Sequence, residues 1–265
     1  MFVPLSADLG RALAAASARR PAAVLHYAPT IGSTNDAALQ LAQQGAPDGT
    51  AVLADEQTAG RGRRGHTWSS PAGAGLYLST IVRGDGLTSL PGCATLGAGV
   101  AAARAVQAAT GLVPSLKWPN DLVLGAAWKK LGGILCEAHG ADALVIGIGI
   151  NLTPAAHPPD VAARAASLEG ELGRPVDRDL LVVELLGALT DLGTALRARR
   201  GAAVIADWRT LVAEGWRGSR VRWQDGAVMA AGVVRDVDDD GALVVERDGV
   251  AVRVIAGEVL WDRLA

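Results

Sequence analysis

Cysteine and histidine are scarce in this chain of 265 residues. The two cysteines, Cys93 and Cys136, form no CxxC pair, and the four histidines show no metal-ligand spacing such as HxxxH. Disulfide-stapled domains and structural zinc sites both need more of these residues at closer spacing. The sequence therefore argues against a disulfide scaffold and against a zinc centre.

Long apolar runs and an excess of positive charge are also missing. No stretch approaches the roughly 18 uninterrupted apolar residues of a membrane span. The N-terminal segment carries Asp8, Arg11, Arg19 and Arg20 among alanines, in place of the apolar core of a signal peptide. The formal net charge of −2 gives no overall attraction to nucleic acid or anionic membranes. We therefore expect a cytoplasmic protein that binds neither, and any anion site must be local.

Lysine is almost absent. Lys117, Lys129 and Lys130 lie within fourteen residues, whereas the other 22 of the 25 basic residues are arginines. Arginine carries a planar fork that stays charged, and lysine is a compact ammonium on a mobile stem, so the two are poor substitutes where geometry is demanding. Chance can also cluster three residues. The alternative is that this stretch is where the chain requires lysine.

Asparagine is equally rare. The three asparagines, Asn35, Asn120 and Asn151, each stand at an expected junction between elements, where an amide can donate and accept hydrogen bonds in fixed directions. Each one alone is an ordinary cap or turn residue. Together with Lys117 and Lys130 they form a constellation that predicts one polar site.

What the chain has in abundance is glycine and arginine in one loop. The segment 60–65, GRGRRG, lets the backbone approach a ligand closely and turn its N–H groups inward, as a phosphate or carboxylate requires. The loop runs into Trp68, which could stack on a base or close a pocket. A solvated loop could have the same composition. The position between two apolar strands favours an anion site.

Two other glycine motifs are interpreted as packing features. The Walker pattern GxxxxGK[ST] is absent, and a match to the dinucleotide fingerprint at 97–102 lacks a convincing strand before it. A packed helix explains this segment better. The segment Gly147-Ile148-Gly149 also fails the fingerprint and predicts a strand that another group approaches closely.

Hydrophobic spacing predicts an α/β mixture with several antiparallel neighbours, which argues against a strictly alternating βαβ fold. The predicted helices are 33–44, 94–109, 178–200 and 202–212. The predicted strands of this part are 50–54, 76–82, 116–118, 121–124, 134–138 and 143–150. After Gly215 the pattern changes to short strands with Asp/Gly turns, which predicts a small β-barrel with strands at 221–223, 231–237, 243–247 and 251–255.

These segments together resemble the biotin protein ligases, over residues 30–152 and in the family's order. The resemblance is carried by Ser33-Thr34-Asn35, QTAGRGRRG at 57–65 with Trp68, LYLS at 76–79, KWPND at 117–121, KLGGIL at 130–135 with Glu137, and GIGINL at 147–152. The C-terminal module is similar to the family's small SH3-like domain, more loosely. His66 departs from the pattern, because many members have Arg or Lys there, and it leaves a weaker, pH-sensitive charge.

The resemblance implies a class II synthetase-like α/β catalytic domain over 1–212 and an SH3-like β-barrel over 213–265. It also implies two half-reactions. The biotin carboxylate attacks the α-phosphate of ATP to give biotinyl-5′-AMP and pyrophosphate, with Mg²⁺. A lysine of a biotin carboxyl carrier protein domain, in acetyl-CoA carboxylase or a related acyl-CoA carboxylase, then takes the acyl group. Whether the protein is a monomer or a homodimer stays open.

The resemblance further implies roles for individual residues. The catalytic candidates are Lys130, Arg63 and Arg61. The biotin-binding candidates are Ser33, Thr34, Asn35, Gln57, Arg61, Gly62, Arg63, Lys130, Gly132 and Gly133. The candidates for binding ATP or the adenylate are Arg61, Arg63, Arg64, Trp68, Asn120, Asp121, Lys130, Asn151 and Arg263. Asp121 is also the candidate for the Mg²⁺ side, and Lys129 is expected to be a solvated surface residue.

Two alternatives remain. A lipoate or octanoyl ligase shares the broad fold, although the GRGRRG loop and the KWPND segment favour biotin. A nucleotide- or nucleic-acid-binding module could use the arginine loop as its grip, but the near-neutral charge argues against it. Some biotin ligases carry an N-terminal winged helix that binds operator DNA. Ser33 already belongs to the first motif here, which leaves too few residues before it, so we expect no operator binding.

Overall fold

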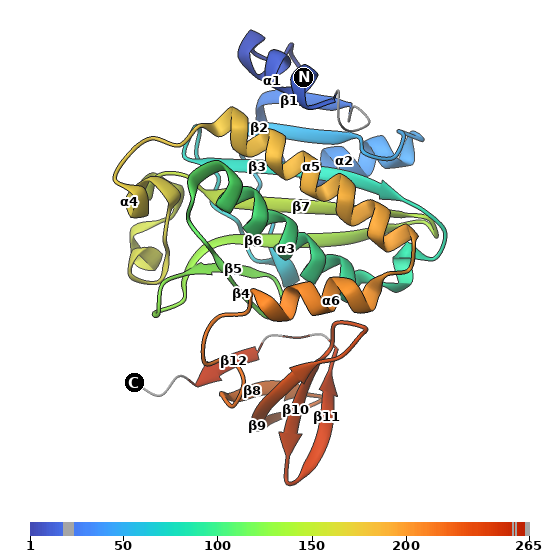
Figure 1. The fold of residues 1–265 in the computed structure, drawn as a ribbon, viewed down its shortest axis with the longest axis vertical. Coiled ribbons are helices and arrows are strands. Elements are labelled where there is room, and N and C mark those ends of the chain that lie inside the picture. The colour runs from blue at the N-terminus through green and yellow to red at the C-terminus, as the bar shows by residue number, and fades with distance from the viewer. Residues whose placement is uncertain (18–23, 256, 258, 263–265) are drawn as a thin grey trace.

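The computed structural model describes residues 1–17, 24–255, 257 and 259–262. These residues form a seven-stranded sheet flanked by helices, followed by a five-stranded sheet that lies below it in Figure 1. Within the described ranges, no helix is both long enough and apolar enough to cross a membrane. The fold is thus a mixed α/β unit followed, toward the C-terminus, by a small all-β unit.

The large sheet is mixed and runs in the order β1-β2-β3-β7-β6-β5-β4. Only β1 and β2 are parallel, and the other neighbours are antiparallel, as the sequence predicts. Helices cover both faces, so the central strands β3 and β7 are buried along almost their whole length. The strands are β1 Leu25–Ile31, β2 Ala51–Gln57, β3 Gly75–Arg83, β4 Ser115–Lys117, β5 Asp121–Leu124, β6 Lys129–His139 and β7 Ala143–Asn151.

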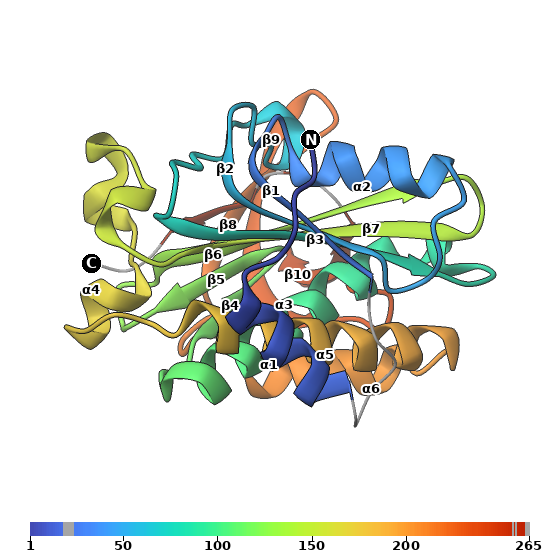
Figure 2. The same cartoon turned by 90° about the horizontal axis from the view of Figure 1, so that it is seen from above.

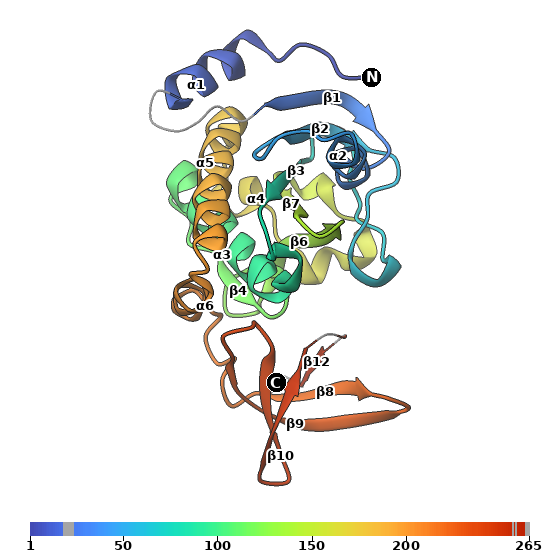
Figure 3. The same cartoon turned by 90° about the vertical axis from the view of Figure 1, so that its right-hand side faces the viewer.

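The helices divide between the two faces of this sheet. Figure 2 shows α2 alone on one face, with α1, α3, α5 and α6 on the other, and Figure 3 shows the same layers from the side. The helices are α1 Ala7–Ser17, α2 Thr34–Gln43, α3 Pro91–Thr110, α4 Leu168–Leu172, α5 Arg178–Arg197 and α6 Gly201–Thr210. Short 3₁₀ turns occupy Arg63–Gly65, Leu87–Ser89, Pro154–Ala156 and Pro159–Arg164.

Helix α3 contains the rejected dinucleotide match, and its glycines serve packing. A Cβ added at Gly97 would lie 2.4 Å from Cδ1 of Leu192 on α5, and one at Gly99 would lie 3.3 Å from Leu116. Helices α3 and α5 approach each other closely because Gly97 has no side chain, and Gly99 lets α3 pack closely on the sheet. The interpretation of 97–102 as a packed helix is therefore confirmed.

The small sheet is antiparallel throughout, in the order β11-β10-β9-β8-β12. Its strands are β8 Arg220–Asp225, β9 Val228–Val237, β10 Leu243–Arg247, β11 Val250–Val254 and β12 Val259–Asp262. Four of these strands were predicted within a few residues. No element was predicted at β12, at α4, or at α1 and β1 near the other end of the chain. A boundary near residue 213 stays a prediction.

Specific contacts join the two sheets. The indole Nε1 of Trp118 donates to the carbonyl of Gly241 at 2.9 Å, and Trp128 packs edge-on against Trp261 with ring centroids 5.7 Å apart. The N-terminus of α3 lies against the same turn of the small sheet, where a Cβ added at Gly92 would lie 2.6 Å from the carbonyl oxygen of Asp240. The segment that follows β4 is thereby fixed between the two sheets.

We expect Gly92→Ala to destabilise the protein. The added methyl group would clash with a main-chain carbonyl that cannot rotate away, and such overpacking costs about 1–3 kcal/mol. Gly10→Ala in α1 is the matched control, because a Cβ there meets nothing within 4 Å and alanine favours a helix. Equilibrium unfolding in urea measures both, and equal free energies of unfolding for the two variants would contradict the close junction.

Candidate active site

One cavity of about 270 Å³ brings together segments that lie far apart in the sequence. Its walls come from the N-terminus of α2, the loop 57–68 between β2 and β3, the segment 117–121, and strands β6 and β7. Thirteen of the predicted site residues line it: Ser33, Thr34, Asn35, Gln57, Arg61, Gly62, Arg63, Arg64, Trp68, Asn120, Asp121, Lys130 and Gly133. The small sheet also reaches this cavity, through Gly257 and Val259.

The α2 end of the cavity is built by a helix cap. Ser33 is the N-cap of α2, with its hydroxyl accepting from the N–H of Asp36 at 3.4 Å, so the first turn presents its polar groups to the cavity. The Oε1 atom of Gln57 accepts from the main-chain N–H and the hydroxyl of Thr34, at 2.8 and 3.1 Å. Its Nε2 donates to Ser70 at 2.8 Å, which fixes the orientation of the amide.

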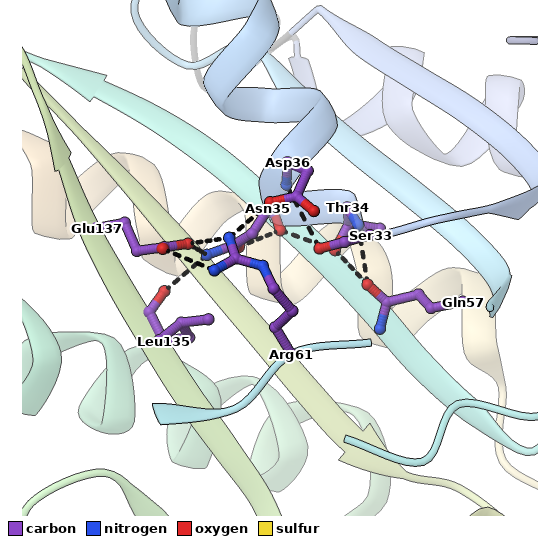
Figure 4. A network of polar contacts seen from close by, with 9 residues as sticks. Ser33, Thr34, Asn35, Asp36, Gln57, Arg61, Leu135 and Glu137 are labelled. Atoms are coloured by element: carbon purple, nitrogen blue, oxygen red, sulfur yellow. Dashed lines mark hydrogen bonds and ion pairs between the residues drawn. The ribbon is translucent and has the colours of Figure 1, made fainter. Parts of the chain in front are cut away.

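A second network crosses the cavity wall from α2 to β6 (Figure 4). The Asn35 amide donates to Glu137 Oε2 at 2.8 Å and to the Leu135 carbonyl at 3.3 Å. The guanidinium of Arg61 forms a two-bond pair with Glu137, at 2.9 and 2.6 Å, and also lies 2.6 Å from Asp36 Oδ1. Mainly through the hydrogen bond to Glu137, the pKa of Arg61 is raised.

Lysines and one aspartate form the opposite wall. Lys130 Nζ lies 2.6 Å from Asp121 Oδ1 and 5.6 Å from the ring centre of Trp68, and Lys117 Nζ lies 3.7 Å from Asp121 Oδ2. A β-bulge aims Lys130 into the cavity. On β5, Leu122 pairs with Gly132 and Val123 with Lys130, so β6 has one extra residue at Leu131.

Arg63 and Arg64 differ in their surroundings. Arg63 is partly buried, which lowers its pKa although the nearby charge of Asp121 opposes the change, and a guanidinium stays charged in any case. Its Nη1 lies 3.4 Å from Asn120 Oδ1, and Asn120 itself donates to the carbonyl of Ile134 at 3.0 Å. Arg64 is exposed and adopts a left-handed backbone conformation, with φ of 55°.

Trp68 lies flat against the sheet floor. A Cβ at Gly149 would lie 2.5 Å from its Nε1, and one at Gly133 would lie 3.4 Å from its ring. Gly147 likewise leaves room for the Asn35 side chain. The prediction that other groups approach the strand closely at 147–149 is therefore confirmed. The Trp68 Nε1 is buried and has no hydrogen-bond partner within the described part of the chain.

The structure does not bring every predicted residue to the cavity wall. Asn151 is buried, and its amide donates to the main-chain carbonyls of Lys130 and Ala166, at 3.3 and 2.9 Å. Gly132 packs against β7, where a Cβ would lie 2.6 Å from the carbonyl oxygen of Gly149. Both residues therefore help to position the backbone of β6, the strand that carries Lys130. Arg263 lies outside the described residues.

A metal site formed by the protein alone does not fit this cavity. No group of three His, Cys, Asp or Glu side chains that could hold a metal ion occurs among the residues the structure describes. Asp121, the predicted Mg²⁺ candidate, already faces two lysines, and a metal ion there would have to displace Lys130.

Sequence reasoning missed three residues of the polar network: Asp36, Ser79 and Glu137. Ser79 is fully buried, its hydroxyl donates to Asn35 Oδ1 at 2.6 Å, and its oxygen lies 2.8 Å from Thr34 Oγ1. Ser79 and Glu137 stood inside the family segments at 76–79 and 130–137, so that signal could have marked them.

The fold and the cavity define a class of protein: a two-part α/β protein in which a Gly/Arg loop and a lysine face one pocket, followed by a small antiparallel sheet. A model of the biotin/lipoate A/B protein ligase family matches residues 27–151, and a model of the biotin protein ligase C-terminal domain matches residues 218–260.

Individual proteins agree with the family models. The chain is 36% identical to the biotin–[acetyl-CoA-carboxylase] ligase of Mycobacterium tuberculosis, over 88% of this chain and 86% of that one. It is 30% identical to the bifunctional ligase/repressor BirA of Bacillus subtilis, over 89% of this chain and 73% of that one. The crystal structure of the Aquifex aeolicus biotin protein ligase with biotin and ATP superimposes with a TM-score of 0.76 and 25% identity, covering 91% of this chain and 99% of that one.

The chain belongs to the biotin/lipoate A/B protein ligase family, and its similarity within that family is to the biotin protein ligases. The resemblance stated from the sequence motifs is thereby confirmed. So is the predicted fold class, a mixed α/β domain with a small C-terminal β domain.

We expect Asn151→Ala to lower the free energy of unfolding by about 1–3 kcal/mol, because it removes a buried amide and leaves the carbonyl of Ala166 without that donor. Thermal or urea unfolding measures the change. If Asn151 were a ligand contact instead, the variant would keep its stability and lose only ligand affinity.

Proposed function

We propose that this protein is an ATP-dependent biotin protein ligase, which forms biotinyl-5′-AMP and then transfers biotin to a lysine of a carrier domain. The observation that supports it best is the shared cavity, in which five sequence segments of the biotin ligase pattern meet. The similarity to ligases that are named for biotin and acetyl-CoA carboxylase agrees with this assignment. The solved relative that holds biotin and ATP points to the same two substrates.

The cavity suits the first half-reaction electrostatically. A carboxylate and a triphosphate repel each other, so the site must supply positive charge and hold both groups in line. Lys130 can turn its mobile ammonium from Asp121 to the reacting oxygens, and Arg63 has no carboxylate within ion-pair distance among the described residues. Lys130 and Arg63 are therefore the proposed catalytic cations.

The polar end of the cavity is the proposed site for the biotin head. Thr34 and Gln57 present a hydroxyl and an amide whose directions are fixed by hydrogen bonds, which is what recognition of a ureido group needs. Trp68 and Gly133 supply an apolar floor, and Asn120 with Arg64 lies toward the proposed nucleotide side. We propose that Mg²⁺ arrives bound to ATP, because Asp121 already pairs with Lys130.

The second half-reaction defines the partner. We propose a biotin carboxyl carrier protein domain of acetyl-CoA carboxylase or a related acyl-CoA carboxylase as the acceptor, in line with the names of the relatives. Cytoplasmic location is part of the proposal, and the free thiols of Cys93 and Cys136 suit a reducing compartment. The absence of operator binding and the choice between monomer and homodimer stay predictions.

Biotin-dependent exchange of pyrophosphate into ATP tests the activity. We expect exchange with biotin, none without an acid, and little with lipoate or octanoate, because adenylation is reversible and requires the acid that the cavity accepts. Incubation with biotin, ATP and a carrier domain should then label that domain. Exchange that needs lipoate in place of biotin would establish the lipoate alternative, and exchange with neither acid would leave the nucleotide-binding alternative.

Lys130→Ala should reduce the exchange rate by about 10²–10³-fold, because it removes positive charge from the place where negative charge develops. Lys129→Ala is the matched control: Lys129 is the adjacent residue, is exposed and does not line the cavity. We expect the control to exchange at the wild-type rate. Equal rates for the two variants would refute the role of Lys130.

A further inference from the structure

Glu137 lies in the family segment at 130–137, yet the sequence assigned it no role. In the structure its carboxylate meets the loop 57–68 from across the cavity wall (Figure 4). It accepts two hydrogen bonds from the guanidinium of Arg61, from Nη1 at 2.9 Å and from Nη2 at 2.6 Å. Two parallel bonds between a guanidinium and a carboxylate fix direction as well as distance. The pair between Arg61 and Glu137 therefore fixes the position of Arg61 in the loop.

The position of Glu137 is itself fixed by a buried chain of hydrogen bonds. Asn35 donates to Glu137 Oε2 at 2.8 Å, and its own Oδ1 accepts from the buried hydroxyl of Ser79 at 2.6 Å. Gly147 makes this arrangement possible, because a Cβ there would lie 2.0 Å from Asn35 Oδ1. Ser79, Asn35, Glu137 and Arg61 thus form one continuous chain from the sheet to the loop.

The tip of the loop has few other attachments. Within the loop, the N–H of Gly62 bonds to the carbonyl of His66 at 2.7 Å and the N–H of Trp68 bonds to the carbonyl of Gly60 at 2.9 Å, which closes the segment on itself. Across the cavity, Arg63 reaches Asn120 only at 3.4 Å. Arg61 therefore gives the tip its short side-chain contacts, two hydrogen bonds to Glu137 and one ion pair with Asp36.

The charges around Arg61 separate its role from that of Arg63. Its guanidinium lies 2.6 Å from Asp36 Oδ1 as well as from Glu137 Oε2, so two carboxylates surround one cation. An anionic ligand at this point would meet a local excess of negative charge. The side chain of Arg61 is therefore engaged by two carboxylates of the protein.

We propose that Glu137 is a positioning residue, which acts through Arg61 to hold the loop 57–68 closed over the cavity and thereby retains the adenylate. The retention step rests on the proposed biotin ligase function. The holding of the loop does not, so the two can be tested separately. Arg61 is the loop side of this latch, and its contact with the ligand stays a prediction.

Trypsin tests the latch without any ligand, because Arg63 and Arg64 are cleavage sites in the loop itself. Glu137→Gln keeps the shape of the side chain and removes its charge. We expect cleavage after Arg63 and Arg64 to accelerate about tenfold, since proteolysis follows the population of the open form. Glu246→Gln is the matched control. It breaks a comparable pair, Arg235 Nη2 to Glu246 Oε2 at 2.8 Å, which lies between β9 and β10.

The second measurement is the rate at which bound biotinyl-adenylate escapes into solution. We expect escape to accelerate on the order of tenfold in Glu137→Gln and in Arg61→Gln, with the melting temperature close to that of Glu246→Gln. The double variant should escape no faster than the faster single variant, because both changes break the same contact. A merely structural role would lower the melting temperature and give additive effects.

The outcomes are separable. Faster cleavage after Arg63 and Arg64 in Glu137→Gln, with the control unchanged, supports the latch, and an unchanged cleavage rate overturns it. If Glu137→Gln fails to fold, Arg61→Gln and Asp36→Asn together decide the question at the same two sites, because Arg61 pairs with both carboxylates. Cleavage that accelerates in Arg61→Gln and not in Asp36→Asn supports the pair with Glu137, and equal acceleration in both overturns it. A wild-type protein that forms no biotinyl-adenylate would refute the proposed function and leave the trypsin result valid.

Discussion

The cavity depends on two missing side chains in β7. Gly147 and Gly149 lie two residues apart, so they face the same side of the sheet. A Cβ at the first would lie 2.0 Å from Asn35 Oδ1, and a Cβ at the second would lie 2.5 Å from Trp68 Nε1. Because β7 has no side chains at these two positions, Asn35 of α2 packs against Gly147 and Trp68 of the loop packs against Gly149. Any larger residue at these positions would separate the two walls from their common floor.

The cations of the site differ in how many carboxylates each one contacts, and this difference suits each cation to a different role. Arg61 is held between two carboxylates, whereas Lys130 shares Asp121 with Lys117 and sits on a flexible stem. Exchanging one oxygen partner for another costs a lysine little reorganisation, while a bidentate arginine loses two directed bonds. The proposed function would give the scarcity of lysine a physical reason, because it requires the Lys130 ammonium to exchange Asp121 for the reacting oxygens.

Much of the frame could be predicted from sequence because it depends on local pattern. The buried strand β7 is a nearly continuous apolar run, β3 alternates enough to mark a strand, and α2 begins at a serine cap. The direction of Lys130 could not be predicted. Strict alternation along β6 would place residue 130 on the face opposite Gly133, and only the extra residue at Leu131 turns it toward the cavity. Glu137 was missed for a similar reason, since its partner Arg61 is 76 residues away.

The small sheet contributes to the site as well as to stability. Trp118 stands in the KWPND segment between Lys117 and the Asn120–Asp121 pair, and its indole bonds to the turn at Gly241. The segment that supplies Asp121 to Lys130 is therefore held from behind by the small sheet, while Val259 of β12 reaches the cavity itself. Because the same five-stranded unit fixes the segment and completes the wall, displacing it would alter the position of Asp121 and hence the resting place of Lys130. Lys130, the proposed catalytic lysine, is thus linked through Asp121 and Trp118 to the C-terminal sheet, and one hydrophobic core spans both parts of the chain.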